Sequence, residues 1–190
     1  MRMFVALIPP ETVLADLAAA VQQRRVNDSG LRWTLREQWH VTLSFLPHVE
    51  EHQLDELGTR LHRAARRRES ATLRVAGAVA FPRPARARVI GVGIDTDGSD
   101  ELRRLATGAR AAATRSGIQV VDAGRFHPHL TLARLRQPTD VRDRPWLLKD
   151  YRGPSWPLSK IALVQSLLRQ GPDGRPRYEL MQTFPVGRAD

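Results

Sequence analysis

Hydrophobic positions along the chain switch between the spacing of strands and the spacing of helices. The apolar runs at 3–8 and 89–94 predict buried strands. Amphipathic helices are predicted at 11–25, 54–68 and 99–116, where apolar residues recur at the spacing of one helical face. Gly117 is suited to end the third helix, because glycine readily adopts the left-handed conformation found there.

The remaining periodic segments add further strands. Extended structure is predicted at 33–35, 39–46, 72–81, 129–135, 159–168 and 177–184, and one short helix within 138–150. The loop-forming residues at 170–174 make the last two strands a hairpin. Pro82 and Pro84 make 81–86 a loop, since proline cannot sit in a central strand. The pattern predicts an α+β fold with largely antiparallel sheets.

A short word of sequence occurs twice. His40-Val41-Thr42-Leu43 is matched 89 residues later by His129-Leu130-Thr131-Leu132. The same offset carries the first predicted helix onto the third, and the opening strand to within a few residues of 89–94. Self-similarity at a fixed offset indicates duplication. We therefore expect two halves of similar build within a single domain, 1–190.

Each of the two repeated motifs places its histidine and threonine on one face of a strand. Successive side chains of a strand point to opposite faces, so each histidine and its threonine share a face, roughly 6–7 Å apart. By the same alternation Ser44 falls on the face of His40, where a lone serine is expected only to line a cleft. Two such words predict one active site with two histidines.

Composition narrows the chemistry. The net charge is +10 and the pI about 11.4, which favours an anionic partner, with a phosphate-bearing polymer the first candidate. The chain has no cysteine, which excludes disulfides, thiolate catalysis and cysteine-ligated metals. No apolar run approaches the ~20 residues that a membrane span needs, so we expect a soluble, cytoplasmic protein without a membrane partner.

Other aromatic and histidine residues are candidates for either a structural or a functional role. Trp33 and Trp39 lie close to the first histidine and are suited either to core packing or, less expected, to stacking on a base. His127 and His129 share a strand face and would suit a metal pair, but no further ligand stands near in the sequence, and we expect no metal. The other three histidines are expected at the surface: His48, His52 and His62.

A family resemblance joins these observations. The chain resembles the bacterial and archaeal RNA 2′,3′-cyclic phosphodiesterases, the 2′-5′ RNA ligase-like branch of the two-histidine phosphoesterase superfamily. The resemblance implies two pseudo-symmetric lobes, each a mostly antiparallel sheet with flanking helices, facing each other across a central cleft. It rests on Trp33, 40–46, Phe81-Pro82, 88–92, 126–134, 166–168, Gly174 and Tyr178.

Two imidazoles suit the opening of a cyclic phosphodiester. One ring takes a proton from water and the other protonates the departing sugar oxygen, and the ordinary histidine pKa of about 6.5 allows both states near neutral pH. Hydroxyls of Thr42 and Thr131 are suited to donate to the phosphate oxygens. The chemistry needs neither a metal nor another cofactor. By analogy with the family, whose usual product is a 2′-phosphate, His129 is expected to be the base and His40 the acid.

The resemblance also implies a phosphate-binding arginine five residues after the second histidine, which is Arg134. Strict alternation puts Arg134 on the face opposite His129, unless a β-bulge turns it back towards the cleft. The two readings are phosphate contact and a structural ion pair.

The leading hypothesis is a monomeric enzyme that hydrolyses 2′,3′-cyclic phosphates on RNA ends or nucleotides to 2′-phosphates, with possible reversal into 2′-5′ RNA ligation. The alternatives are a non-catalytic module that binds RNA ends, a phosphodiesterase acting on a small nucleotide metabolite, and a metal-dependent hydrolase built on His127 and His129.

Overall fold

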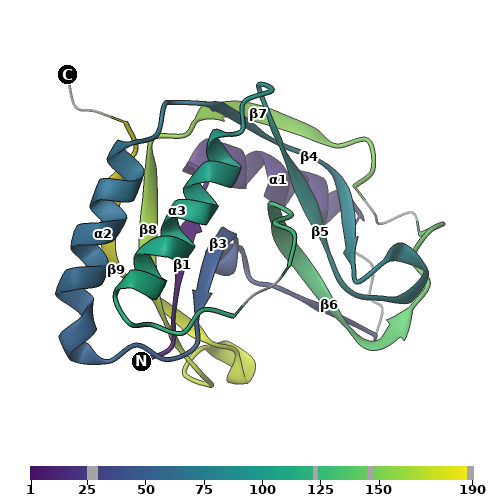
Figure 1. The fold of residues 1–190 in the computed structure, drawn as a ribbon. Helices are drawn as coiled ribbons and strands as arrows, with labels where there is room; N and C mark the ends of the chain where they lie inside the picture. Colours follow the sequence, from purple (N-terminus) through teal and green to yellow (C-terminus); the bar gives the residue numbers. More distant parts are fainter. Residues whose placement is uncertain (25–29, 122–123, 145–147, 188–190) are drawn as a thin grey trace.

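The computed structural model describes residues 1–24, 30–121, 124–144 and 148–187. In these ranges the chain forms three α-helices and nine β-strands (Figure 1). The helices are α1 (Glu11–Arg24), α2 (Leu54–Arg66) and α3 (Glu101–Arg115). The strands are β1 (Met3–Leu7), β2 (Leu31–Trp33), β3 (Val41–Leu46), β4 (Thr72–Phe81), β5 (Ala87–Thr96), β6 (His129–Thr139), β7 (Arg152–Pro157), β8 (Lys160–Leu167) and β9 (Arg177–Pro185).

The strands join into one curled antiparallel sheet. Their order is β7-β4-β5-β6-β3-β1-β8-β9, and β2 lies beside β6 off this path. The paired strands run antiparallel throughout. The predicted α+β fold with antiparallel sheets is confirmed, and so is the hairpin of β8 and β9.

One residue pair joins the middle of the sheet. β3 and β6 are registered only through Val41 and Leu130, whereas the neighbouring strand pairs share from three to eight registered positions. This joint divides the sheet into a β3 half-sheet (β3, β1, β8, β9) and a β6 half-sheet (β7, β4, β5, β6, β2). The divided sheet is the counterpart of the two lobes that the resemblance implies.

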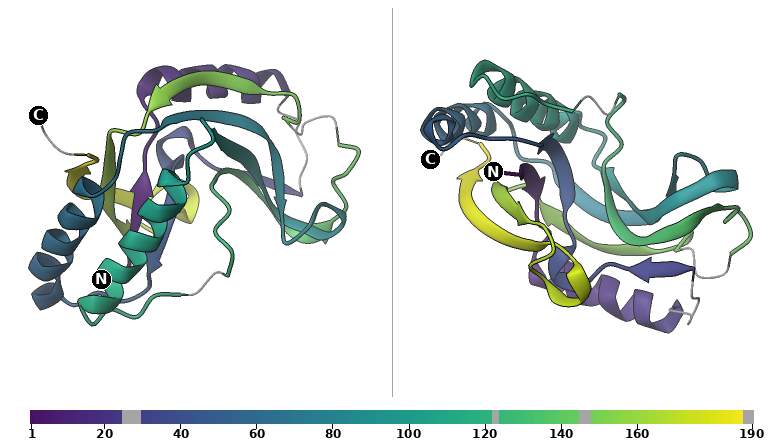
Figure 2. Two further views of the ribbon diagram at one scale, coloured as in Figure 1. Left: turned by 45° about the horizontal axis from the view of Figure 1, so that its top comes forward. Right: turned by 90° about the horizontal axis from the view of Figure 1, so that it is seen from below.

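The helices cover opposite sides of the curled sheet. α2 and α3 pack side by side over the β3 half-sheet, with α3 against β3 and α2 against β9, while α1 packs against β7 of the β6 half-sheet. Figure 2 shows the strands between these two helical layers. Each helix therefore packs its apolar stripe on one face of a half-sheet, and the other face is left for polar side chains.

The main core lies beneath the helices. Fully buried side chains of α1, α2 and α3 pack there against inward-facing residues of the strands, among them Val41 and Leu130 at the joint. None of the helices in the described ranges is long and apolar enough to cross a membrane.

Two segments differ in kind from the sequence prediction, and the strand predicted at 33–35 begins and ends two residues earlier, as β2. β7 was not predicted, because Pro154 and Pro157 interrupt its pattern; it is an edge strand, where proline is tolerated. The prediction of a short helix within 138–150 is wrong for the described part of that segment. Pro138 and Thr139 complete β6 and the other described residues form turns and irregular structure, while 145–147 lie outside the described residues.

Candidate active site

The joint between the half-sheets brings the two sequence words together. Val41 and Leu130 are direct antiparallel partners and point into the core, with both side chains fully buried. Their sequence neighbours therefore point to the opposite face. Continuing the register by one residue in each direction sets His40 beside Thr131, and Thr42 beside His129. Both histidines consequently line the same cavity, as the sequence predicted.

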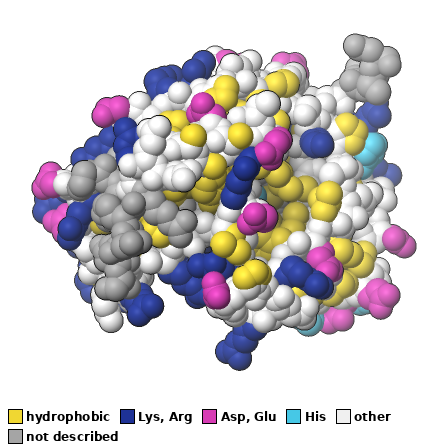
Figure 3. All heavy atoms as spheres, turned by 180° about the vertical axis from the view of Figure 1, so that it is seen from behind, with side chains coloured by type: hydrophobic (Ala, Val, Ile, Leu, Met, Phe, Trp, Pro, Cys, Tyr) yellow, Lys and Arg dark blue, Asp and Glu magenta, His cyan; other side chains and the backbone are white. Residues whose placement is uncertain are grey.

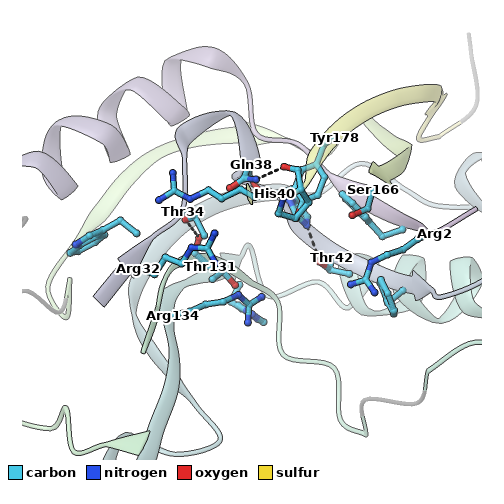
Figure 4. Close-up of a pocket in the computed structure, with 16 residues that line it drawn as sticks. Arg2, Arg32, Thr34, Gln38, His40, Thr42, Thr131, Arg134, Ser166 and Tyr178 are labelled. Carbon is cyan, nitrogen blue, oxygen red and sulfur yellow. Dashed lines mark hydrogen bonds between the residues drawn. The ribbon is translucent and has the colours of Figure 1, made fainter. Parts of the chain in front are cut away.

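The cavity holds about 480 Å³ between the two half-sheets (Figure 4). Four arginines and two histidines line it, and its lining contains neither aspartate nor glutamate. The face of the molecule drawn in Figure 3, in contrast, carries acidic and basic side chains interspersed. A cavity with several cations and no carboxylate favours an anionic ligand. Its lining residues are Arg2, Phe4, Arg32, Trp33, Thr34, Gln38, His40, Thr42, Phe45, His129, Thr131, Arg134, Ser166, Arg175, Pro176 and Tyr178.

Backbone carbonyls fix the tautomer of both histidines in the same way. His40 Nδ1 lies 2.7 Å from the carbonyl oxygen of Gln38, and His129 Nδ1 lies 2.7 Å from that of His127. A carbonyl only accepts, so each Nδ1 carries a proton, and in the neutral ring the basic nitrogen is Nε2. His40 Nε2 lies 3.1 Å from the Thr42 hydroxyl, which donates to it when the ring is neutral.

The two imidazoles sit in unequal aromatic surroundings. The His40 ring stacks on Phe4, with ring centroids 4.4 Å apart, and meets Tyr178 edge-on. The His129 ring contacts Phe81 at 4.6 Å in a tilted arrangement. Tight packing places the His40 ring in the drier of the two environments.

Burial lowers the pKa of both rings. Loss of hydration is the main cause that lowers the pKa of His40 to about 4, partly offset by the bond to the Gln38 carbonyl. Burial is also the main cause that lowers the pKa of His129, to a smaller extent, with Arg134 acting in the same direction. Both rings are therefore neutral at pH 7 in the empty site.

A β-bulge follows each histidine at the same place. In β3, Ser44 pairs with Val5 and Thr42 with Ala6, which leaves Leu43 as an extra residue. In β6, Ala133 pairs with Ile90 and Thr131 with Gly91, which leaves Leu132 extra. An extra residue shifts the inside–outside alternation of the strand by one position.

The bulges decide which side chains enter the cavity. Arg134 lines it although strict alternation points it away, which fits the bulge anticipated from the sequence. Phe45 lines it for the same reason. The expectation that Ser44 faces the cleft is wrong, because the shift turns Ser44 inward, where its side chain is buried and forms no part of the lining.

Neighbouring residues hold the β6 bulge in place. A Cβ at Gly91 would lie 2.0 Å from the carbonyl oxygen of Leu130, so only glycine permits this close approach. The Thr34 hydroxyl lies 2.7 Å and 2.8 Å from the carbonyl oxygens of Thr131 and Leu132, and its single proton is shared between them. Trp39 in turn donates its Nε1–H to the Thr34 hydroxyl, at 3.0 Å. These contacts link the chain next to His40 with the chain next to His129.

The structure separates the two tryptophans. Trp39 is buried in the core, as the more expected reading had it, and does not line the cavity. Trp33 lines the cavity and packs against the main core and against the smaller cluster around Ile90 and Leu135.

The other histidines lie outside the cavity lining. His48, His52 and His62 are exposed, as predicted. His127 is also exposed, and its backbone carbonyl rather than its ring contacts His129. In the described part of the chain, no group of three histidine, aspartate or glutamate side chains is placed to hold a metal ion.

Several lining residues escaped the sequence analysis. Phe4 lies in β1 and Arg2 just before it, and their spacing of two residues was the only available signal. Arg32, Thr34, Gln38 and Arg175 come from short segments without periodicity, so their position depends on tertiary contacts. One such contact joins the Gln38 side-chain amide to the carbonyl oxygen of Pro176, at 2.7 Å.

Comparison with known proteins agrees with the fold and with the duplication. The family model described as LigT like Phosphoesterase matches the chain in two consecutive segments, 8–91 and 92–172. An RNA 2′,3′-cyclic phosphodiesterase of Aeropyrum pernix is 38% identical over 151 residues, which cover 76% of this chain and 82% of that protein. One of Thermus thermophilus is 33% identical over 192 residues, 98% of this chain and 90% of that protein.

Solved structures show the same fold. The structure of TT0787 of Thermus thermophilus superposes with a TM-score of 0.78 at 30% identity, over the whole of both chains. The E. coli LigT structure complexed with 3′-AMP superposes with a TM-score of 0.79 at 24% identity, over 98% of each chain. With these matches spanning most of its length, the chain belongs to the LigT-like phosphoesterase family.

Proposed function

We propose that the protein hydrolyses the terminal 2′,3′-cyclic phosphate of RNA, or of a nucleotide, to a 2′-phosphate. The observation that carries the proposal is the pair of imidazoles in one carboxylate-free cavity, each with Nδ1 bonded to a backbone carbonyl, so that Nε2 is the basic nitrogen of the neutral ring. The names of the relatives from Aeropyrum pernix and Thermus thermophilus support the same reaction.

In the proposed mechanism His129 acts as base and His40 as acid. The negative charge of the bound phosphate raises the pKa of His40, so that its ring takes up a proton from solvent on Nε2. His129 Nε2 then takes a proton from water as the water oxygen bonds to phosphorus, and protonated His40 gives its Nε2 proton to the 3′ oxygen as the P–O3′ bond breaks. The surroundings of the rings support this order. The less buried His129 is the stronger base, and the strongly lowered pKa of His40 makes its protonated ring the stronger acid.

The remaining polar side chains bind the phosphate. Hydroxyls of Thr42 and Thr131 and the guanidinium of Arg134 donate to the non-bridging oxygens, where negative charge grows as the fifth oxygen approaches phosphorus. These donors come from the protein itself, so the proposed reaction proceeds without a metal ion. Both histidines come from one chain, and the protein is proposed to act as a monomer.

Ligation uses the same geometry. If the 5′-hydroxyl of a second RNA replaces water as the nucleophile, the same base and acid form a 2′-5′ linkage and release the 3′ oxygen. We propose this as a slower side activity, because water is more abundant than an RNA 5′ end.

The decisive test is a product assay on a short RNA ending in a 2′,3′-cyclic phosphate, with EDTA present and the 2′- and 3′-monophosphates resolved. We expect the 2′-monophosphate, and a loss of activity in His40→Ala and in His129→Ala of the order of 10²–10⁴-fold each. Full activity in either variant would overturn the mechanism. Tight, salt-sensitive binding without turnover would favour a module that only binds RNA ends, and silencing by EDTA would favour a metal-dependent hydrolase.

A further inference from the structure

Phe45 occupies the position that corresponds to Arg134. Each is the fifth residue after its histidine, each follows the bulge in its strand, and each lines the cavity. The 89-residue offset that relates the two histidines relates these residues as well. The β6 half-sheet therefore supplies a cation at this position, whereas the β3 half-sheet supplies an aromatic ring.

Arg2 lies on that ring. The guanidinium carbon of Arg2 is 4.4 Å from the centroid of Phe45, the geometry of a cation–π contact. Arg2 comes just before β1, the neighbour of β3, and lines the cavity. Figure 4 shows Arg2 on the Thr42 side of the cavity and Arg134 on the Thr131 side. The aromatic ring thus positions a guanidinium on the side that has no arginine of its own in β3.

The charge of Arg2 is available to a ligand. Arg2 and Arg134 are both exposed, and no carboxylate of the described residues forms an ion pair with either. Both act on one neighbour: burial raises the pKa of Tyr178, and the charges of Arg134 and Arg2 each counteract that rise. The fields of the two guanidinium groups therefore overlap at the tyrosine that packs on His40.

We propose that Arg2, held on Phe45, binds the reacting phosphate from the side opposite Arg134. Each half-sheet then contributes a histidine, a threonine and an arginine to the same phosphorus, although the two arginines come from unrelated positions in the chain. The guanidinium donates to a non-bridging oxygen and stabilises the charge that develops in the transition state. This inference rests on the proposed function and adds a catalytic residue to it.

The test compares Arg2→Gln with Arg63→Gln, which removes an equal charge from an exposed position of α2 on the helix-covered side. The assay is hydrolysis of a short RNA with a 2′,3′-cyclic phosphate, with kcat and KM measured separately. We expect kcat/KM of Arg2→Gln to fall at least about tenfold, mainly through kcat, because the contact strengthens in the transition state. Arg63→Gln is expected to match the wild type.

Two further variants separate charge from position. Arg2→Lys keeps a point charge and should recover part of the loss, since an ammonium lacks the planar fork of a guanidinium. Phe45→Leu removes the ring beneath Arg2 and should lower activity as well. In the double variant with Arg2→Gln, the effects should be less than additive, because both changes disrupt the same contact.

Binding of adenosine 2′-monophosphate gives a second readout. Its inhibition constant should rise in Arg2→Gln and depend less on salt than in the wild type, since one phosphate contact is lost. Thermal unfolding shows whether each variant is folded; if Arg2→Gln is not, Arg2→Lys and Phe45→Leu decide the question. Activity and inhibition of Arg2→Gln within about threefold of Arg63→Gln would overturn the assignment. An inactive wild type would instead refute the proposed function itself.

Discussion

The segments 38–45 and 127–134 share one backbone design and differ in their side chains. Each presents a carbonyl to Nδ1 of a histidine two residues later, places a threonine two residues beyond the histidine, and then bulges at a leucine. The first segment continues to Phe45 and the second to Arg134. The repeated backbone creates a nearly symmetric cavity, and the side chains make its two halves unequal.

The asymmetry is electrostatic as well as steric. His40 lies between Phe4 and Tyr178, and burial lowers its pKa to about 4, whereas His129 has Phe81 on one side and a smaller lowering. Two rings with the same sequence motif therefore hold protons with different strength. A site built from two equal halves could not distinguish the attacking oxygen from the departing one.

The largest effect expected from the different roles of His40 and His129 appears with a substrate whose leaving group needs no proton. A cyclic substrate with sulfur in place of the bridging 3′ oxygen releases a thiolate, which leaves without an acid. With it, His40→Ala should recover most of its activity, while His129→Ala should remain of the order of 10²–10⁴-fold below the wild type. The rates of both variants on the oxygen and sulfur substrates provide the measurement. Recovery of His129→Ala instead would reverse the two roles.

A smaller effect is expected from the residue that follows the bulge in β6. Arg134→Gln should lower kcat/KM by roughly 10²-fold, because one charged donor to the phosphate is lost. Arg136→Gln, two residues further along the same strand and outside the cavity lining, is the matched control and should retain activity. Steady-state kinetics on the cyclic substrate measure both. If the two variants behave alike, Arg134 does not contact the phosphate and has only a structural role.

The smallest effect concerns pH and stability. In the folded state the pKa of His40 is lowered to about 4, below the ordinary value of 6.5, so the unfolded chain binds the proton more readily. The free energy of unfolding is therefore unaffected by this titration above pH 6.5. It decreases as the pH falls from 6.5 towards 4, because the unfolded chain is protonated at His40 before the folded protein is. Urea unfolding at pH 7 and pH 4.5 should show a loss of roughly 1–3 kcal/mol that His40→Gln reduces. An equal loss in that variant would contradict the lowered pKa.

The sequence predicted the elements that depend on local pattern. The amphipathic helices and most strands follow from the spacing of apolar residues, and the pairing of His40 with His129 follows from the repeated word. β7 escaped because an edge strand tolerates prolines that would exclude it from the centre of a sheet. β7 forms by pairing with β4, which lies far from it in the sequence, so local pattern does not predict it.

The site was predicted less completely, because the bulges break the period of two on which the argument for facing residues relied. Ser44 and Arg134 change faces through Leu43 and Leu132, which look like ordinary strand residues. Glycine at position 91, which permits the second bulge, lies on another strand. Arg2 shows the same limitation, since its place over Phe45 depends on β1 pairing with β3.

The single link between Val41 and Leu130 has a consequence for how such proteins diverge. The spacing of the two imidazoles depends on the main chain at this crossing point and on the hydrogen bonds of Thr34 beside it. Loops and outer strands of either half can then change with little effect on the separation of the two imidazoles. Preservation of the architecture at 30% identity is what such a centrally anchored molecule permits.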